Sequence, residues 1–576
     1  MKGGISSLKI PNKEDWQKNP AVDARTKAEL SAICSPQEEE DRFYRFLSFG
    51  TGGLRGKMGA GNNRINLYTV RRATAGLGAY LKETEKHPSV CIAYDTRNGS
   101  QEFAKAAAEV LAAADIEVLF YDGIRPTPML SWAVRYHKAA AGIVITASHN
   151  PREYNGYKVY GADGGQITDH AADSIQKQIE RFGLFDLPFL PFSQALKEGK
   201  IRYMGEETDA PYYRQVRSLS LRGELLEKKA KELKILYSPL HGTGNLPVRR
   251  VLRELGFSQV SVVAQQELPD GNFPTAPRPN PENREVFTLA MEMAQTLQPD
   301  LIFATDPDCD RIGVLSQDEK GEYAVLTGNQ TGALLTEYIL HTHSERGTLP
   351  KNAAVIKTIV SSSMAEKICA AYGIPVFDVL TGFKYIGELA ESWQKNGDHV
   401  FLFGFEESYG YLAGNFVRDK DAVIAAALIA EMALWYKQQG KTLYQALNSL
   451  FQKYGWHQEK LISIELPGKE GQEQIERLLA ALRRDYGGFF AGKQPVMIED
   501  YQQHTRLVCS TGERIPLQLP ASNVLKFFFE EGSWLVLRPS GTEPKIKCYL
   551  SVRGSSKKEA EQALSALEKL AARLIG

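Results

Sequence analysis

The chain has 576 residues, and its 69 Lys and Arg residues balance 69 Asp and Glu residues to give a formal net charge of zero. This balance excludes a bulk electrostatic field that would draw the protein to nucleic acid or to an anionic membrane. The length predicts four domains, because one hydrophobic core serves about 100 to 200 residues. The six cysteines include no C-x-x-C pair, which argues against a zinc site and a disulfide framework and indicates a cytoplasmic protein with reduced thiols.

The sequence also argues against secretion and membrane insertion. Its N-terminal residues have no apolar core of signal-peptide length. The most apolar stretch, residues 422–436, is interrupted by Glu431 and is too short to span a bilayer. We therefore expect a buried helix there and no membrane contact.

The first domain is predicted over residues 1–216. Residues 12–47 are charged and helical in pattern, and Pro36 opens a helix after Ser35. They lead to F-G-T-G-G-L-R-G-K-M-G-A-G-N-N-R, residues 49–64, where Arg55 is one of three cations available to an anionic ligand; a flexible surface loop is the alternative. Beyond this segment the periodicity predicts a helix at 101–114 and strands at 89–94, 116–121 and 141–145.

The strand at 141–145 runs into a polar loop that carries Ser148, our candidate nucleophile. Its β-branched residues are typical of a strand buried on both faces, and ligands of open α/β sheets bind beyond the carboxyl ends of such strands. His149 and Lys158 bring a proton-transfer group and a cation into the same loop, and Asn155-Gly156 is a turn signal that would fold Lys158 back toward Ser148. An ordinary polar loop is the alternative. Two other segments, Y-D-T-R at 94–97 and R-P-T-P at 125–128, fit a purely structural role.

Two further α/β units are predicted over residues 217–325 and 326–456, and an α+β domain over 457–576. Ser556 and Glu559 form a predicted capping box on the last helix. The expected architecture is three similar mixed α/β sandwich domains plus a C-terminal α+β domain around a central active-site cleft. The periodicity predicts helices at 246–255, 282–296, 362–372, 385–394 and from about 421, and strands at 234–237, 259–263, 300–304, 353–359, 375–379, 400–403, 461–465, 524–529, 534–537 and 545–552.

Three aspartates alternate in T-D-P-D-C-D-R, directly after a predicted strand. Asp306, Asp308 and Asp310 can therefore converge on one hard cation, as an Mg²⁺ or Ca²⁺ site requires. An EF-hand loop is excluded, because its sixth position would be Arg311 rather than Gly and its twelfth would be Gln317 rather than Glu. A solvated Asp-rich turn is the alternative.

Two further loops carry groups that suit a phosphorylated sugar. Glu406 and Ser408, in G-F-E-E-S at another strand end, offer a carboxylate and a hydroxyl to neighbouring sugar hydroxyls. Residues 538–544, R-P-S-G-T-E-P, combine a guanidinium group, two hydroxyls and a glycine that together can hold a phosphate, and Lys547 adds charge. A β-turn joining two strands is the alternative for this segment.

In this order, T-A-S-H-N-P, D-P-D-C-D-R, G-F-E-E-S and R-P-S-G-T-E-P resemble the motifs of the α-D-phosphohexomutase superfamily. The similarity runs from about Phe49 to the C-terminus and covers four domain-sized segments. The length of the chain, the glycine-rich segment and T-G-F-K-Y-I-G at 381–387 resemble the long phosphoglucomutase and phosphopentomutase branch.

The resemblance implies an intramolecular phosphotransferase. It would interconvert glucose 1-phosphate and glucose 6-phosphate through a phosphoserine enzyme, with glucose 1,6-bisphosphate as intermediate and activator. Ser148 would carry the phosphoryl group, and Mg²⁺ would be held by a phosphoryl oxygen on Ser148 and by Asp306, Asp308 and Asp310. Such a transfer needs charge neutralisation and in-line positioning more than covalent activation.

The resemblance also implies roles for the remaining motif residues. Arg55, Lys158 and Arg311 would add positive charge around the transferring group. The candidate proton-transfer groups His149, Lys158 and Lys420 stay unranked. The substrate would be held by Gly382, Lys384, Glu406, Ser408 and Arg418, and its non-reacting phosphate by Arg538, Ser540, Gly541, Thr542 and Lys547.

One departure from the family pattern bears on the substrate. Members of the phosphomannomutase type have G-E-x-S-G-H, whereas Tyr409 and Gly410 follow Ser408 here. The same fold leaves three alternatives: a phosphopentomutase, a phosphomannomutase or a glucose 1,6-bisphosphate synthase. A catalytically silent sugar-phosphate sensor and an Mg²⁺-dependent phosphomonoesterase are rivals of other classes. In each case the partner is a small-molecule sugar phosphate, and we expect a monomer or homodimer.

Overall fold

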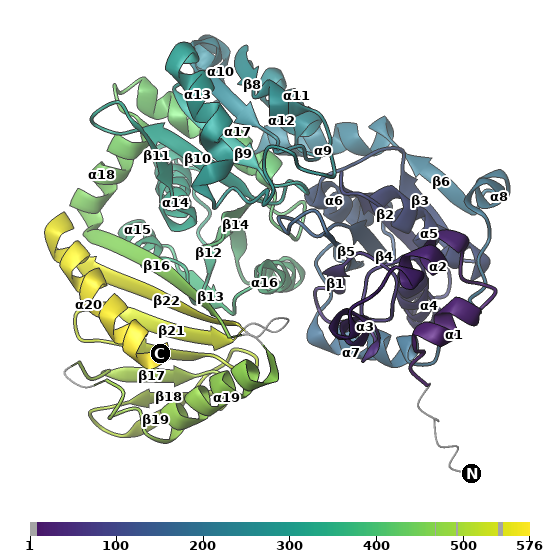
Figure 1. The fold of residues 1–576 in the computed structure, drawn as a ribbon. Helices are drawn as coiled ribbons and strands as arrows, with labels where there is room; N and C mark the ends of the chain where they lie inside the picture. Colours follow the sequence, from purple (N-terminus) through teal and green to yellow (C-terminus); the bar gives the residue numbers. More distant parts are fainter. Residues whose placement is uncertain (1–8, 467, 491–492, 540–544, 576) are drawn as a thin grey trace.

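Four sheets follow one another along the chain in the computed structural model, which describes residues 9–466, 468–490, 493–539 and 545–575. The first three sheets mix parallel and antiparallel strands between helices, and the fourth is antiparallel throughout (Figure 1). This architecture confirms the predicted fold class, while the exact domain boundaries stay predictions. Within the described ranges, no helix is long and apolar enough to cross a membrane. The six cysteines are free, as their spacing predicts.

Three short helices precede the first sheet. Each begins after a side-chain cap, from Asn12, Asp23 and Ser35 respectively, which satisfies a backbone N–H of the first turn. Pro36 is the first helical residue after Ser35, as predicted. The helices are α1 (Lys13–Lys18), α2 (Ala24–Ser31) and α3 (Pro36–Phe43).

The first sheet has the strand order β1-β5-β4-β2-β3-β6. Strands β4, β2, β3 and β6 are parallel, whereas β5 pairs antiparallel with β4 and β1 pairs antiparallel with β5 at the other edge. The strands are β1 (Leu54–Lys57), β2 (Ser89–Tyr94), β3 (Glu117–Tyr121), β4 (Ala141–Ile145), β5 (Tyr154–Gly161) and β6 (Ile201–Met204). The helices are α4 (Leu67–Thr84), α5 (Ser100–Ala113), α6 (Thr127–His137), α7 (Asp169–Ile179), α8 (Phe192–Lys197) and α9 (Glu206–Ser218).

One sequence expectation for this domain is wrong, and one alternative does not hold throughout its segment. Asn155-Gly156 does not turn the chain but lies inside β5, because both residues pair with β1, opposite Gly56 and Arg55. The glycine-rich segment is likewise not a loop throughout, since it contains β1. The turn that brings Lys158 back lies earlier, between β4 and β5, and the two strands pair Val144 with Lys158.

The second sheet, ordered β11-β10-β9-β7-β8, carries the aspartate loop after β9. The helix predicted at 282–296 is interrupted: a 3₁₀ turn, η2, directs Val286 and Phe287 into the core before α13 begins. The strands are β7 (Lys234–Ser238), β8 (Gln259–Val262), β9 (Leu301–Thr305), β10 (Ile312–Gln317) and β11 (Tyr323–Leu326). The helical segments are α10 (Gly223–Lys229), η1 (Ala230–Glu232), α11 (Asn245–Glu254), α12 (Ala264–Glu267), η2 (Arg284–Phe287) and α13 (Thr288–Leu297).

The third sheet, ordered β13-β12-β14-β15, ends its longest strand at Glu406. The strands are β12 (Ala353–Thr358), β13 (Val376–Val379), β14 (Val400–Glu406) and β15 (Gly410–Ala413). The helices are α14 (Gly328–Glu345), α15 (Met364–Ala371), α16 (Phe383–Asn396), α17 (Ala422–Lys437) and α18 (Leu443–Tyr454).

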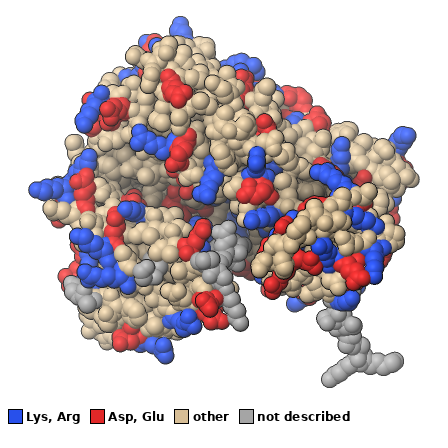
Figure 2. Space-filling model, in the orientation of Figure 1, with Lys and Arg blue, Asp and Glu red and all other residues tan. Residues whose placement is uncertain are grey.

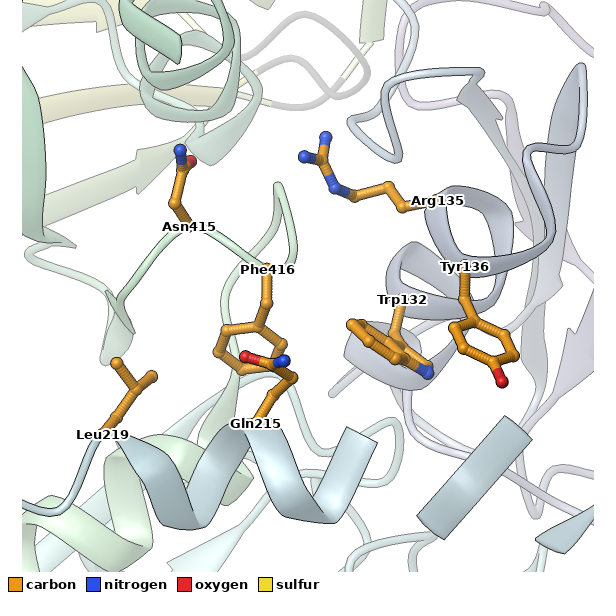
Figure 3. A pocket seen from close by; sticks show the side chains of 7 residues that line it. All are labelled: Trp132, Arg135, Tyr136, Gln215, Leu219, Asn415 and Phe416. Carbon is orange, nitrogen blue, oxygen red and sulfur yellow. The ribbon is translucent and has the colours of Figure 1, made fainter. Parts of the chain in front are cut away.

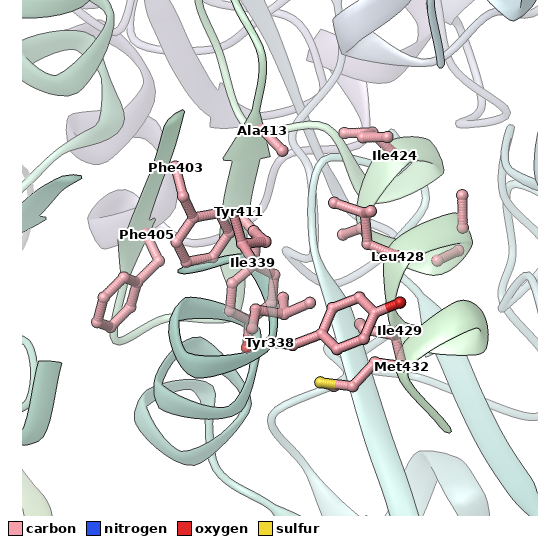
Figure 4. Packing of buried hydrophobic residues seen from close by; sticks show 14 of the residues in the cluster. Tyr338, Ile339, Phe403, Phe405, Tyr411, Ala413, Ile424, Leu428, Ile429 and Met432 are labelled. Atoms are coloured by element: carbon pink, nitrogen blue, oxygen red, sulfur yellow. The ribbon is translucent and has the colours of Figure 1, made fainter. Parts of the chain in front are cut away.

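Helix α17 is the buried helix that the apolar stretch predicts, and it joins the second and third domains. It packs against α11 and β9 on one side and against β15 and α14 on the other. Figure 4 shows its residues Leu428 and Met432 beside Tyr338 of α14 and the aromatic side chains of β14 and β15. Glu431 is buried within this helix and accepts hydrogen bonds from the Tyr338 hydroxyl (2.6 Å) and the Leu221 amide (2.9 Å).

The fourth sheet has the order β16-β22-β21-β20-β17-β18-β19. Leu567, Leu570 and Leu574 on one face of α20 pack on it. The predicted capping box forms only in part: the Ser556 hydroxyl accepts from the Glu559 amide, but the Glu559 carboxylate reaches back to Ser555. The elements are β16 (Trp456–Glu465), α19 (Gly468–Arg484), β17 (Met497–Asp500), β18 (Thr505–Val508), β19 (Glu513–Pro516), β20 (Leu525–Phe528), β21 (Trp534–Pro539), β22 (Lys545–Gly554) and α20 (Lys557–Ile575).

The surface reflects the balanced composition. On the face drawn in Figure 2, Lys and Arg are interspersed with Asp and Glu over every lobe, and the surface is hollowed where the C-terminal sheet faces the other domains. The functional loops therefore have to supply their own local charge.

Candidate functional site

Ser148 lies just beyond the carboxyl end of β4 and is only 4% exposed. Its backbone is left-handed, with φ of 51°, a conformation that costs a non-glycine residue roughly 1–2 kcal/mol. The Ser148 amide donates to the Thr146 hydroxyl at 2.8 Å, which helps to fix the turn. A strained residue held in this way at a strand end is typical of a functional position.

The three predicted aspartates converge beside this serine. Asp306, Asp308 and Asp310 are buried after β9, and one carboxylate oxygen from each lies within 4.8 Å of the others. The Ser148 hydroxyl donates to Asp306 Oδ2 at 2.7 Å. The first and second domains thus bring a hydroxyl and three carboxylates to one point, although the motifs are about 160 residues apart in the chain.

Two lysines neutralise part of this negative charge. Lys158 Nζ lies 2.8 Å from Asp308 Oδ2 and 3.4 Å from Asp310 Oδ2. Lys420 Nζ lies 3.2 Å from Asp310 Oδ2 and from Asp419 Oδ1. Lys158 comes from β5, whereas Lys420 comes from the segment before α17, so three domains contribute to the cluster.

The three carboxylates still outnumber the two lysines, and the pKa values of these groups reflect that difference in charge. Burial and the neighbouring carboxylates of Asp308 and Asp310 raise the pKa of Asp306 well above its usual range. Burial also opposes ionisation of Asp308, but Lys158 outweighs it and holds the pKa of that carboxyl below its usual value. Although burial disfavours the lysine charges, the aspartates raise the pKa of both Lys158 and Lys420, so both are ammonium ions at neutral pH.

The donor set fits a divalent cation. Oδ1 of Asp308 and Oδ1 of Asp310 are buried and have no hydrogen-bond partner among the described residues. Unpaired buried carboxylate oxygens are costly unless a cation binds them, and oxygen ligands of this kind are those that Mg²⁺ prefers. A cation would also relieve the mutual repulsion that raises the pKa of Asp306.

His149 is the third predicted proton-transfer group. Its Nδ1 lies 3.4 Å from the Ser148 hydroxyl oxygen. Burial, with the nearby guanidinium groups of Arg311 and Arg55, lowers the pKa of His149 well below its usual value. The imidazole is therefore neutral at neutral pH, in contrast to the two lysines.

The predicted sugar loop is joined to the aspartate loop through the backbone. The Ile312 amide donates to the Tyr409 carbonyl at 3.1 Å, and Arg311 forms a β-bridge with Gly410. Glu406 is buried at the end of β14, and Ser408 follows in the turn. The loop thereby lies beside the aspartate loop.

Several predicted cations are already paired in this structure. Arg311 donates to Glu282 at 2.6 Å, and Arg55 of β1 donates to the Asn150 side chain at 3.4 Å. Lys384 forms an ion pair of 3.1 Å with Asp169. Gly382 precedes α16 with a positive φ of 122°, a backbone conformation that favours glycine.

Arg418, one of the predicted substrate ligands, is held by protein groups in this structure. Its guanidinium group is fully buried between the first and third domains, where it forms an ion pair of 2.8 Å with Glu391. It also donates to the backbone carbonyls of Asn415 and Val417 at 3.0 and 2.9 Å. These partners occupy several of its donors in this structure, and its role as a substrate ligand stays a prediction.

The predicted phosphate loop can be described only at its flanks. Arg538 is the residue before the last one of β21 and pairs across the sheet with Lys547 of β22. Burial and the adjacent Arg538 lower the pKa of Lys547. Ser540, Gly541 and Thr542 lie outside the described residues.

Sequence patterns did not assign two supports of the aspartate loop to the candidate site. The Thr127 hydroxyl, at the start of α6, donates to Asp308 Oδ2 at 3.0 Å. Thr243 donates from its amide (2.8 Å) and its hydroxyl (2.9 Å) to the Pro307 carbonyl, and a Cβ at Gly242 would lie 2.5 Å from Pro307 Cα. The sequence signal that could have found the second support is H-G-T-G after a strand, because glycines there allow another backbone segment to approach closely.

A cavity of about 450 Å³ lies outside this cluster (Figure 3). It opens between α6, α9 and the segment after β15, and it contains none of the site carboxylates or lysines. Its lining residues are Trp132, Arg135, Tyr136, Gln215, Leu219, Asn415 and Phe416. The convergence of functional groups, rather than this cavity, therefore identifies the site.

The sequence matches four domain descriptions in chain order: Phosphoglucomutase/phosphomannomutase, alpha/beta/alpha domain I over residues 47–183, domain II over 210–321, domain III over 327–454, and the C-terminal domain over 461–569. The chain belongs to the phosphoglucomutase/phosphomannomutase family. The four matches include Ser148, the aspartates, Glu406 and Arg538, so each of these residues lies in a separate domain of the family.

Similar proteins extend over nearly the whole chain. The phosphoglucomutase of Staphylococcus haemolyticus is 38% identical over 91% of this chain and 93% of its own length. That of Staphylococcus aureus is 36% identical over 98% and 100%, respectively. Two solved structures share the fold. Parafusin (phosphoglucomutase) from Paramecium has a TM-score of 0.69 and 19% identity, and the match covers 92% of this chain and 94% of that one. A phosphomannomutase described as putative, from Thermus thermophilus, has a TM-score of 0.65 and 23% identity, and the match covers 91% of this chain and 99% of that one.

Proposed function

We infer that the protein is a phosphoglucomutase, an intramolecular phosphotransferase that interconverts glucose 1-phosphate and glucose 6-phosphate. Family membership and the phosphoglucomutases that align with nearly the full chain support the activity. The observation that carries the mechanism is the Ser148 hydroxyl 2.7 Å from Asp306, inside a cluster of three carboxylates and two lysines. Such a cluster neutralises and positions a phosphoryl group rather than hydrolysing an ester by nucleophilic attack of a carboxylate.

In the proposed cycle, Ser148 starts as phosphoserine. The bond between its Oγ and phosphorus breaks while the substrate's free hydroxyl oxygen bonds to phosphorus, giving glucose 1,6-bisphosphate. The bisphosphate turns end for end and returns its other phosphoryl group to Ser148. The two ends of one substrate thus react in turn at a single serine, and the product contains the same atoms as the substrate.

The first transfer moves one proton from the sugar hydroxyl to Ser148 Oγ, and the return transfer moves one proton from Ser148 Oγ to the sugar oxygen that gives up its phosphoryl group. His149 is neutral and its Nδ1 is 3.4 Å from Ser148 Oγ, so we propose it as the group that exchanges the proton. Lys158 and Lys420, whose pKa values are raised, would instead stay protonated and stabilise charge on the phosphoryl oxygens.

Asp306, Asp308 and Asp310 would hold Mg²⁺, which supplies further neutralisation of phosphoryl charge when bound. Glu406 and Ser408 would bind sugar hydroxyls, with Gly382 and Lys384 at the rim of the same cleft. Arg55 and Arg311 would add charge near the transferring group. Arg538, Lys547 and residues 540–542 would hold the non-reacting phosphate.

A coupled assay of glucose 6-phosphate formation from glucose 1-phosphate, started with glucose 1,6-bisphosphate and Mg²⁺, tests this function. Parallel assays with mannose 1-phosphate and ribose 1-phosphate separate the phosphomannomutase and phosphopentomutase alternatives. Formation of glucose 1,6-bisphosphate from a separate phosphoryl donor would identify the synthase. Net release of inorganic phosphate without isomerisation would overturn the mutase assignment.

A further inference from the structure

Arg97 follows β2, and its side chain is completely buried beneath the loop that carries Ser148. One terminal nitrogen of its guanidinium group donates to the carbonyls of Ser148 and Asn150. The other donates to the carbonyls of Pro151 and Tyr154 at 3.0 and 3.2 Å. A single side chain thus binds four backbone carbonyls of the turn between β4 and β5.

These carbonyls need a donor because the turn points them inward. A buried carbonyl without a hydrogen bond costs about 1–3 kcal/mol, and here the left-handed backbone of Ser148 adds its own cost. The planar guanidinium fork can serve several acceptors in fixed directions, which the single ammonium group of lysine cannot do. The geometry of the turn therefore depends on an arginine at this position.

Asp95 keeps this guanidinium group charged and oriented. Its Oδ2 lies 3.3 Å from Arg97 Nε, while its Oδ1 accepts from the Arg97 amide at 2.9 Å and from the Ser100 hydroxyl at 2.6 Å. Burial lowers the pKa of Arg97, and the Asp95 carboxylate opposes that effect. The ion pair is thus built into the domain beneath the nucleophile.

Arg97 also contacts the domain that carries the aspartates. Its guanidinium carbon lies 5.0 Å from the centre of the Phe273 ring, in the second domain. Beside it, the Asn98 side chain donates to Asn272 at 3.0 Å, and a Cβ at Gly271 would lie 2.4 Å from the Asn98 nitrogen. Arg97 is thus packed between the Ser148 turn and the second domain.

We propose that Arg97 is a positioning residue for phosphoryl transfer, which holds the Ser148 turn in its left-handed form and in register with the aspartate loop. The proposal rests on the proposed role of Ser148. Arg97 itself does not touch the substrate. Its contribution is to keep Ser148 Oγ aligned for in-line transfer in both halves of the cycle.

Arg97→Lys tests this proposal, since it keeps the positive charge but loses the fork. Misplacement of a nucleophile by about 1 Å can cost about 100-fold in rate, so we expect kcat to fall about 100-fold while KM for glucose 1-phosphate stays within about threefold. Intact-mass measurement should also show slower phosphorylation of Ser148 by glucose 1,6-bisphosphate. A purely structural role would lower stability without this split between kcat and KM.

Arg72→Lys is the matched control. Arg72 is also a buried arginine of the first domain, donates to the Phe182 carbonyl at 2.8 Å, and lies 4.0 Å from the centre of the Phe46 ring. It is remote from the Ser148 turn in these contacts. We expect its lysine variant to lose comparable thermal stability but to keep kcat within about threefold.

Asp95→Asn is the second variant, in case Arg97→Lys does not fold. Its amide would place a donor against Arg97 Nε, so kcat should again fall more than KM rises. Wild-type kcat in a folded Arg97→Lys or Asp95→Asn protein would overturn the proposal, as would an equal loss of kcat in Arg72→Lys. Ser148→Ala separates the two hypotheses: turnover in that variant refutes the role of Ser148 itself, whereas its inactivity with normal Arg97→Lys kinetics refutes only the role of Arg97.

Discussion

At the scale of single residues, the Ser148 hydroxyl is the group on which the proposed chemistry depends. Its contacts are few: a hydrogen bond to Asp306 and a 3.4 Å approach to His149. The hydroxyl can therefore be removed without creating a cavity larger than one oxygen atom. The same is not true of the aspartates, because each one is bonded into the loop or to a lysine.

Ser148→Ala should fold with a melting temperature close to that of the wild-type protein and still bind glucose 1-phosphate. Turnover should fall on the order of 10⁴-fold or more, because the phosphoryl acceptor is lost. A coupled assay and isothermal titration calorimetry measure the two properties. Intact mass provides a further check: the wild-type protein should gain one phosphoryl group from glucose 1,6-bisphosphate and the variant none. Substantial turnover would remove Ser148 from the mechanism.

Asp308→Asn should weaken Mg²⁺ binding and lower kcat about 100-fold or more, since charge stabilisation by a metal is worth several kcal/mol. Lys158 would also lose its nearer partner, which lies at 2.8 Å. The measurement is the Mg²⁺ dependence of the rate, together with direct Mg²⁺ titration by calorimetry. Asp318→Asn, in the exposed turn after β10, is the control and should leave both unchanged. A wild-type Mg²⁺ dependence in Asp308→Asn would count against the metal site.

At the scale of secondary-structure elements, the bounds of strands that are buried on both faces were predicted correctly. The predicted ranges for β2 and β4 agree with the structure at both ends, because their apolar runs are buried and each is followed directly by a polar residue, Asp95 or Thr146. Strand β5 was missed because it contains Asn155 and Gly156, whose local preference for a turn is overridden by pairing with β1 and β4. Strand β19 is exposed along its length and has no apolar pattern to find.

The residues of the candidate site also fall into two groups: those that a short sequence motif identifies, and those that only contacts between distant parts of the chain identify. Ser148, the aspartates and Glu406 could be found because each follows a strand in a short motif. Arg97 and Thr127 could not be assigned, because their roles come from contacts across 51 and 181 positions of the chain. The surroundings of Arg418 could not be predicted for the same reason, since only the fold shows that it pairs with Glu391 of α16.

Strand β16 carries a glutamate that makes stability depend on pH. The Glu459 carboxylate accepts from the Ser362 hydroxyl, and burial raises its pKa from 4.5 to about 7. Between these two values the folded chain keeps a proton that the unfolded chain has released. The free energy of unfolding should therefore fall as the pH rises from about 4.5 to about 7.

Glu459→Gln should remove this contribution and flatten the dependence. Urea unfolding at about pH 5 and about pH 7.5 measures it, as the difference in unfolding free energy between the two conditions. The exposed Glu561→Gln, in α20, controls for the general effect of losing a carboxylate. Equal slopes in the wild-type protein and in Glu459→Gln would show that this carboxyl does not hold the proton.

At the scale of the whole molecule, the C-terminal domain has its own hydrophobic core and meets the third domain through a smaller apolar cluster. That cluster joins Ile359, Val360 and Leu380 to Trp534 and other residues of the fourth sheet. Arg538 and Lys547 lie in β21 and β22, and Figure 1 shows these strands across the molecule from the first domain. Closure of this domain on the non-reacting phosphate would complete the site and exclude water.

Arg538→Lys should therefore impair both binding and turnover. Losing the bidentate fork removes a charge-assisted hydrogen bond worth about 1.5–3 kcal/mol, which predicts a rise in KM of roughly tenfold to hundredfold and a lower kcat. Phosphorylation of Ser148 by glucose 1,6-bisphosphate should suffer less, because the bisphosphate has an additional anchoring group. Steady-state kinetics and a single-turnover mass measurement test the two statements. Unchanged KM and kcat would argue against both the phosphate site and closure.

Helix α17 sets a limit on how the chain can be divided. By sequence it follows the third sheet, yet it packs against α11 and β9 of the second and is buried on all sides. Excising the third domain would therefore expose one face of α17 to solvent and strip a cover from the second sheet. A chimaera made from two related enzymes should exchange the second and third domains together, whereas the C-terminal domain, with its separate core, is the piece that can be exchanged alone.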